Sequence, residues 1–179
     1  RLQETRWYPG QHGTRNADGL TSGRRHTGPN VLDGNRVLAA LQGTRCEVDV
    51  TTDFAQVAWR KLVQNARAGL MVLTGRRAGM FSRIDITGLS LALLQECLAV
   101  ARAEGAALGD EVPQEILAWF HRAPADLSTS ILTDRQADRP LEWDCRNGVI
   151  QRRGQAHGIA TPISDLIVPL LAAASDGPG

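Results

Sequence analysis

From Asp53 onward, apolar residues recur every three or four positions, and Gly, Pro and Thr separate one such segment from the next. This spacing puts apolar side chains on one face of a helix and predicts a succession of amphipathic helices. Aromatic residues make up only 4% of the 179 residues, so a core has to be built from Leu, Val, Ile and Ala. The pattern therefore predicts a mainly α fold, a helical bundle, over residues 52–179.

Individual helices can be placed from their caps and their apolar stripes. A helix starting at Thr87 is expected to end before Gly105 and to turn Leu89, Leu93 and Glu96 inward. A segment rich in Gly and Arg, 75–79, is expected to connect two helices. The predicted helical segments are 53–69, 87–104, a helix beginning after Asp110, 126–136, 143–157 and 164–174.

The first 51 residues differ from the rest in composition. Residues 1–30 are rich in Gly, Arg, Thr and Asn without a clear period, which is typical of loop or irregular structure. Residues 47–51 alternate with β-branched side chains and predict a strand. We therefore expect a domain boundary near residue 52, with 1–51 as the end of a strand-containing domain and 52–179 as a helical domain.

Composition also bears on partners and location. A formal net charge of +1 gives no reason to expect nucleic-acid binding, and no uninterrupted apolar run is long enough to span a membrane. Three widely spaced cysteines without a metal-binding pattern predict free thiols, no metal site and a reducing, cytoplasmic location. The chain starts at Arg1 and has no signal peptide, so we expect a fragment or a processed chain.

Lysine is nearly absent, because nineteen of the twenty Lys and Arg residues are arginine and Lys61 is the one lysine. Lysine can lose its proton near neutral pH when it is buried or crowded, whereas arginine stays charged. On a helix, Lys61 and Asn65 share a stripe with Phe54 and Val57, where unpaired polar groups are costly. From spacing alone, a functional Lys61 and a lysine that merely extends its ammonium into water are equally supported.

A second polar stretch contains Ser130, Asp134 and Glu142. From spacing alone, the favoured interpretation is structural. A serine would begin a helix there, and the two carboxylates would lie on solvated faces.

Taken together, these stretches resemble the C-terminal domain of ketopantoate reductases (2-dehydropantoate 2-reductases). The family's ordered motifs are matched by Trp59, Lys61, Leu62 and Asn65; by Glu96, Val100, Ala101 and Gly105; by Ser130, Asp134, Arg139, Glu142, Asp144, Asn147 and Gly148; and by His157, Gly158, Ile159 and Pro162. The resemblance covers about residues 47–173. It departs at Gly69, where the family often has a second Asn, and at Thr129 and Leu141.

The resemblance implies the helical domain of a 6-phosphogluconate-dehydrogenase-type fold, preceded by the last strand of a Rossmann domain that binds NADPH. It implies reduction of 2-dehydropantoate to pantoate. Lys61 would be the general acid that protonates the carbonyl oxygen. Glu142 would bind the substrate hydroxyl and hold the Lys61 ammonium, while Asn65 and Ser130 would bind substrate oxygens.

The glycine-rich phosphate loop of such cofactor domains is absent from the sequence. The chain alone is therefore expected to bind NADPH weakly and to be inactive. Two alternatives remain open: a reductase of a different 2-keto acid, and a non-catalytic helical module for dimerisation or binding. A homodimer through the helical domain is a further expectation.

Overall fold

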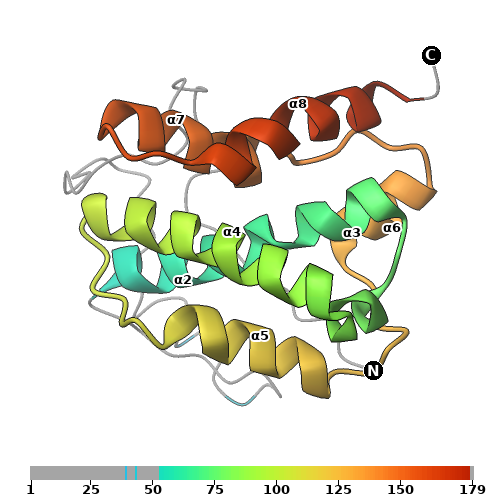
Figure 1. The fold of residues 1–179 in the computed structure, drawn as a ribbon, viewed down its shortest axis with the longest axis horizontal. Helices are drawn as coiled ribbons and strands as arrows, with labels where there is room; N and C mark the ends of the chain where they lie inside the picture. The colour runs from blue at the N-terminus through green and yellow to red at the C-terminus, as the bar shows by residue number, and fades with distance from the viewer. Residues whose placement is uncertain (1–38, 40–42, 44–52, 178–179) are drawn as a thin grey trace. The chain divides into compact units, whose positions relative to one another are not determined.

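The computed structural model describes residues 39, 43 and 53–177 (Figure 1). The chain divides into two compact units, Arg1–Phe54 and Ala55–Gly179, of which the second is described almost completely. The strand predicted at 47–51 lies outside the described residues. The assignment of 1–51 to the end of a strand-containing domain therefore stays a prediction.

The predicted helical bundle is confirmed for the second unit, where residues 55–177 form helices and turns and no strand. In Figure 1, α4 crosses the middle of this unit, with α7 and α8 along one side and α5 along the other. The elements are α2 (Phe54–Ala66), α3 (Ala68–Thr74), η1 (Ala78–Ser82, 3-10), α4 (Ile84–Ala103), α5 (Val112–Arg122), α6 (Ser130–Gln136), η2 (Asp144–Gly148, a turn of π-helix), α7 (Val149–Ala156) and α8 (Pro162–Asp176).

Helix α4 is the central core helix. Its predicted end is confirmed, because Gly105 follows it with φ of +88°, but it begins one turn before Thr87. Leu93 is fully buried, as predicted, while Leu89 is exposed. By length and composition α4 could cross a membrane, a possibility missed by considering uninterrupted apolar runs alone. In the structure α4 packs against α5, α7 and α8, and its buried residues include Leu93, Leu94 and Cys97.

The helix predicted at 53–69 is interrupted rather than ended near Gly69. The amide of Leu70 donates to the carbonyl of Arg67 at 3.1 Å, instead of reaching back four residues to Ala66. Helix α3 then continues to Thr74, and Gly75 ends it in the left-handed conformation at φ of 64°. The break leaves the Ala66 carbonyl without its usual helical partner.

Arg67, at the break, has a side chain that is completely buried. Its guanidinium lies 3.6 Å from the ring centroid of Phe81 and 3.3 Å from that of Phe120, and its three nitrogens have no hydrogen-bond partner among the described residues. Burial lowers the pKa of Arg67 to about 9, so the group is still protonated at neutral pH. Cation–π attraction to the two rings is thus what partly offsets the loss of hydration.

Helix α8 is attached to α4 by one carboxylate. Glu96 accepts hydrogen bonds from the Ile163 amide at 2.7 Å, the Ser164 amide at 3.0 Å and the Ser164 hydroxyl at 2.9 Å. These amides belong to the first turn of α8, where backbone N–H groups have no intrahelical acceptor and the helix dipole favours a negative charge. Glu96 therefore caps α8 from another helix.

We predict that Glu96→Ala lowers the free energy of unfolding by roughly 2–3 kcal/mol, because charge-assisted hydrogen bonds are lost and the α8 amides are left without an acceptor. Urea unfolding of the chain, followed by circular dichroism, measures the change. Glu115→Ala is the control, since it removes an ion pair whose partners are half exposed and which contributes about 0–1 kcal/mol. Equal effects of the two changes would contradict the capping role.

Candidate functional site

Lys61 and Asn65 lie one turn apart on α2, and both side chains are half-buried. The predicted inward stripe of this helix is wrong: Trp59, Val63 and Ala66 are the buried residues, whereas Phe54 is 49% exposed. Lys61 follows Trp59 by two residues, so its side chain points about 200° around the helix axis from that of Trp59. Lys61 is therefore on the side of α2 turned away from the bundle core.

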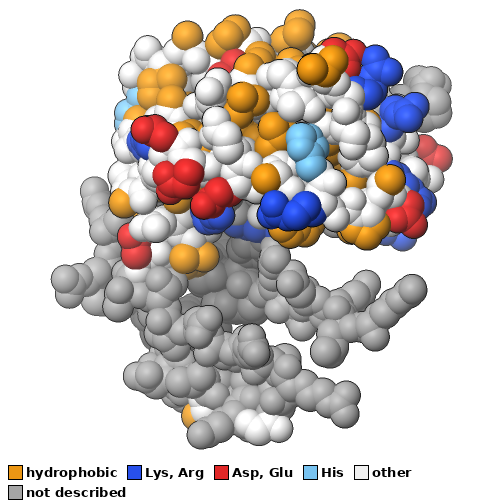
Figure 2. Space-filling model, turned by 60° about the horizontal axis from the view of Figure 1, so that its bottom comes forward, with side chains coloured by type: hydrophobic (Ala, Val, Ile, Leu, Met, Phe, Trp, Pro, Cys, Tyr) orange, Lys and Arg blue, Asp and Glu red, His pale blue; other side chains and the backbone are white. Residues whose placement is uncertain are grey.

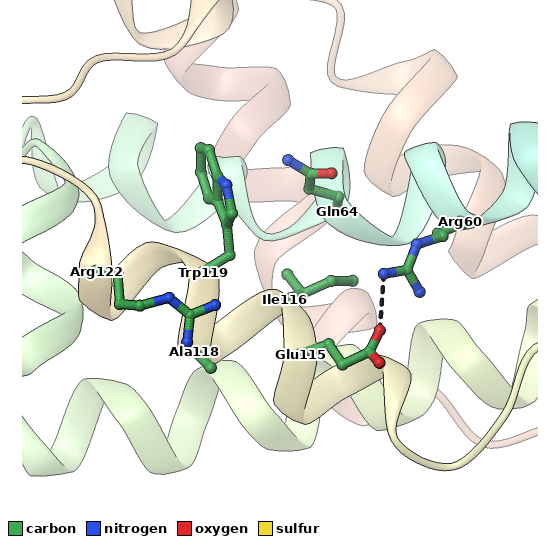
Figure 3. Close-up of a pocket in the computed structure, with 7 residues that line it drawn as sticks. All are labelled: Arg60, Gln64, Glu115, Ile116, Ala118, Trp119 and Arg122. Carbon is green, nitrogen blue, oxygen red and sulfur yellow. Dashed lines mark hydrogen bonds and ion pairs between the residues drawn. The ribbon is translucent and has the colours of Figure 1, made fainter.

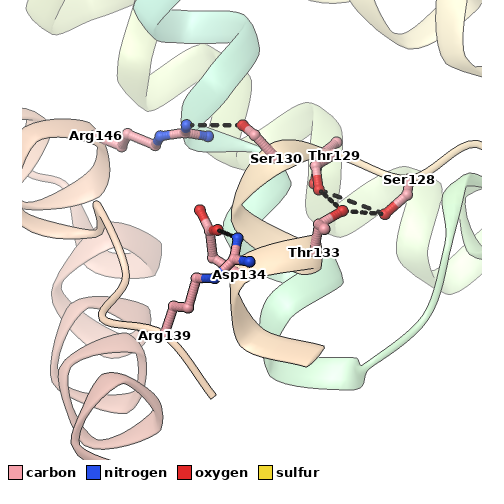
Figure 4. Close-up of polar contacts among 7 residues, drawn as sticks. All are labelled: Ser128, Thr129, Ser130, Thr133, Asp134, Arg139 and Arg146. Carbon is pink, nitrogen blue, oxygen red and sulfur yellow. Dashed lines mark hydrogen bonds and ion pairs between the residues drawn. The ribbon is translucent and has the colours of Figure 1, made fainter. Parts of the chain in front are cut away.

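Ser130 and Glu142 are brought together by Arg146, which no sequence motif marked as a site residue. Nη2 of Arg146 donates to Oγ of Ser130 at 3.2 Å and to Oε2 of Glu142 at 2.8 Å. Ser130 is the first residue of α6, Glu142 precedes η2, and Arg146 lies within η2; Figure 4 shows the contact of Arg146 with Ser130. The side chain of Arg146 is 11% exposed and that of Glu142 is 58% exposed.

The sequence did carry a signal for Arg146, because Glu and Arg four residues apart form pairs on a helix. That signal predicts only a surface ion pair. The contact with Ser130, sixteen residues away in the chain, comes from the packing of η2 near α6 and could not be read from spacing.

The structural interpretation of the Ser130 stretch is partly right. Ser130 does begin a helix, but no side-chain oxygen caps that helix. The hydroxyl of Thr133 instead donates to the carbonyl of Thr129 at 3.1 Å (Figure 4). Asp134 is half-buried and bonds Arg139 at 3.2 Å, rather than lying on a fully solvated face.

Asn147 ties this segment to the helix that carries Lys61. Its side chain is completely buried, and Nδ2 donates to the Ala66 carbonyl at 2.8 Å, the group released by the break after α2. A Cβ at Gly69 would lie 3.0 Å from Oδ1 of Asn147 and 3.0 Å from Leu171. The space that a side chain at position 69 would need is thus filled by Asn147.

Among the described residues, a hollow of about 470 Å³ lies between α2 and α5 (Figure 3). An ion pair of 2.8 Å between Arg60 and Glu115 crosses it. None of the four predicted site residues lines it. Its walls are Arg60, Gln64, Glu115, Ile116, Ala118, Trp119 and Arg122. On the face drawn in Figure 2, acidic, basic and apolar side chains of the described residues are interspersed rather than separated by kind.

The structure therefore joins Ser130 with Glu142 through Arg146, and it anchors η2 beside Asn65 through Asn147. The described residues contain no cluster of His, Cys, Asp and Glu that could hold a metal ion. The catalytic roles and the meeting of all four residues in one cleft stay predictions.

Residues 53–175 match the family model described as the ketopantoate reductase PanE/ApbA C terminal. The chain belongs to this family. A 2-dehydropantoate 2-reductase of Mycobacterium tuberculosis is 60% identical over 139 residues, which cover 78% of this chain and 47% of the relative. One from Caulobacter vibrioides is 40% identical over 142 residues, covering 79% and 49%.

Solved ketopantoate reductases share the fold. A dimeric enzyme from Staphylococcus aureus superposes with a TM-score of 0.75 at 25% identity, over 81% of this chain and 51% of that one. A family member from Ralstonia eutropha gives 0.73 at 28% identity, over 79% and 48%. The chain spans about half the length of the curated relatives it matches, and the matched half is the ketopantoate reductase C-terminal domain.

We predict different effects of alanine at two helical glycines. Gly88→Ala in α4, where a Cβ meets nothing within 4 Å, should stabilise by roughly 0.5–1 kcal/mol because the unfolded chain loses freedom. Gly69→Ala should give no such gain or should destabilise by about 1–3 kcal/mol, since Asn147 and Leu171 must move. Urea unfolding of the two variants compares them, and equal stabilisation would show that the contact at Gly69 is relaxed at no cost.

Proposed function

We propose that this chain is the substrate domain of an NADPH-dependent reductase that converts 2-dehydropantoate to pantoate. The observation that carries the proposal is the placement of Lys61 and Asn65, one turn apart on the side of α2 that the bundle core does not use. The family membership and the name of its relatives support this substrate and this reaction.

Reduction of a 2-keto acid requires a hydride at the carbonyl carbon and a proton at the carbonyl oxygen. A bound nicotinamide supplies the hydride. In the proposed mechanism Lys61 donates its Nζ proton to the oxygen and stabilises the alkoxide as it forms. Asn65, through its amide, and Ser130, through its hydroxyl, would hold substrate oxygens, and Glu142 would accept a hydrogen bond from the substrate hydroxyl.

The described residues do not fit the phosphates of the cofactor. The segment 75–79 connects α3 to η1, with Gly75 as a helix cap, so the element directly before it is a helix rather than a strand. A pyrophosphate loop needs glycines between a strand and a helix N-terminus. The proposal therefore assigns tight NADPH binding to a Rossmann domain other than this helical unit.

Two alternatives are kept in view. Gly69 and Leu141 depart from the family pattern, which would suit a different 2-keto acid. Because the Staphylococcus aureus relative is dimeric, we also propose a homodimer through the helical domain. The second alternative is a non-catalytic helical module that serves only dimerisation or binding. A cytoplasmic location is proposed from the cysteines, since Cys97 and Cys145 are free thiols.

We predict that Lys61→Arg in the full-length protein lowers kcat by at least about 100-fold, because a guanidinium keeps the charge but is a poor proton donor near pH 7. Steady-state assays with 2-dehydropantoate measure it, and the KM for NADPH should change little. Arg76→Lys, at an exposed position between α3 and η1, is the control. Near-normal turnover of Lys61→Arg would refute the acid role.

We also predict that the 179-residue chain by itself binds NADPH with a dissociation constant weaker than about 100 μM, because a helical unit without a phosphate loop offers few backbone donors to the pyrophosphate. Calorimetric titration of NADPH into the purified chain tests this. Micromolar or tighter binding would place a cofactor site within the chain.

A further inference from the structure

We propose that Arg146 is a positioning residue, which fixes the hydrogen-bonding roles of Ser130 and Glu142 toward the carboxylate and hydroxyl groups of the substrate. The inference rests on the proposed function, because it assigns a device to the same site. One guanidinium nitrogen of Arg146 contacts both side chains, Ser130 at 3.2 Å and Glu142 at 2.8 Å.

The three side chains differ in burial: Arg146 is largely buried, whereas Ser130 and Glu142 are exposed. Arg146 is 11% exposed, whereas Glu142 is 58% exposed and Ser130 is exposed. A guanidinium is planar and rigid, so it holds its acceptors in a fixed geometry. Arg146 thus holds its two partners from the buried side, and both remain accessible to a ligand.

The contact determines what the Ser130 hydroxyl can offer. Arginine only donates hydrogen bonds, so Oγ of Ser130 must be the acceptor in its bond to Arg146. The single hydroxyl proton of Ser130 is then left for another acceptor. A substrate carboxylate is such an acceptor, so the contact prepares Ser130 to donate to it.

The same nitrogen determines what Glu142 can offer. Oε2 of Glu142 accepts from Arg146, and its other oxygen has no partner among the described residues, so that oxygen can accept from a substrate hydroxyl. A 2-keto acid is an anion, and a lone carboxylate beside it would repel it. The Arg146 charge at 2.8 Å from Glu142 offsets that repulsion.

The backbone that carries Arg146 is itself held. The Arg146 amide bonds the Trp143 carbonyl at 3.3 Å, and the Gly148 amide reaches the same carbonyl at 3.0 Å, which makes the wide π turn of η2. The next residue, Asn147, is anchored to Ala66. Such turns often occur at functional sites, and here the turn directs the guanidinium toward α6.

The test uses the full-length protein with Arg146→Met, which keeps an unbranched apolar stem but removes the charge and the donors. KM for 2-dehydropantoate and the calorimetric dissociation constant of pantoate in the presence of NADP+ should both rise about 10- to 100-fold, with KM for NADPH unchanged. Arg83→Met, which removes an exposed arginine bound to Asp85, should leave all three within about twofold.

A double-mutant cycle separates positioning from general packing. Ser130→Ala should weaken pantoate binding in the wild-type background and have little further effect beside Arg146→Met, because Ser130 depends on Arg146 for its orientation. Arg146→Lys should restore part of the affinity through its charge. If Arg146→Met does not fold, as judged by circular dichroism, the Lys variant with and without Ser130→Ala decides the question.

Additive effects in the cycle, or unchanged affinity for both substrate and product, would overturn the role of Arg146 while the reductase assignment stood. A wild-type protein that reduces no 2-dehydropantoate would instead refute the proposed function. The two failures are therefore distinguishable.

Discussion

The candidate site depends on one buried hydrogen bond, from the amide of Asn147 to the carbonyl of Ala66. That carbonyl is available because the helix breaks at Arg67, and a buried carbonyl left without a donor would be costly. The bond fixes η2, which carries Arg146, against the end of α2, which carries Lys61 and Asn65. Two segments 81 residues apart in the chain are thereby held in a constant relation, which the proposed chemistry requires.

The sequence predicted the helical elements well because apolar spacing and capping are local properties. It failed where tertiary contacts decide. No Pro or adjacent Gly at Arg67 predicts the break in the helix. The Arg67 guanidinium stacks on Phe81 and Phe120, which are distant in sequence. The buried face of α2 was misassigned because apolar residues lie on both of its sides and the burial of Trp59 outweighs that of Phe54.

The candidate residues Lys61, Asn65, Ser130 and Glu142 came from ordered motifs and a resemblance. Spacing alone is also consistent with a purely structural role for each of them. The structure adds the pair of contacts made by Arg146, and it explains why Gly69 has no side chain. Neither could be read beforehand, because both depend on which distant segment fills a given space. A motif thus identifies groups that can react, and packing decides how they are presented.

The cap that Glu96 places on α8 also bears on how the domain folds. The Thr161 side chain does not cap α8. The N-terminal amides of α8 instead bond to Glu96 of α4, and Glu96 lies 67 residues before Ile163 in the chain. Contacts this distant in sequence close a long loop, whose entropy cost must be offset by other contacts between α4 and α8. Helix α8 should therefore become stable only after α4 is in place, so that protection of its amides from hydrogen exchange reports completion of the whole bundle rather than local helix formation.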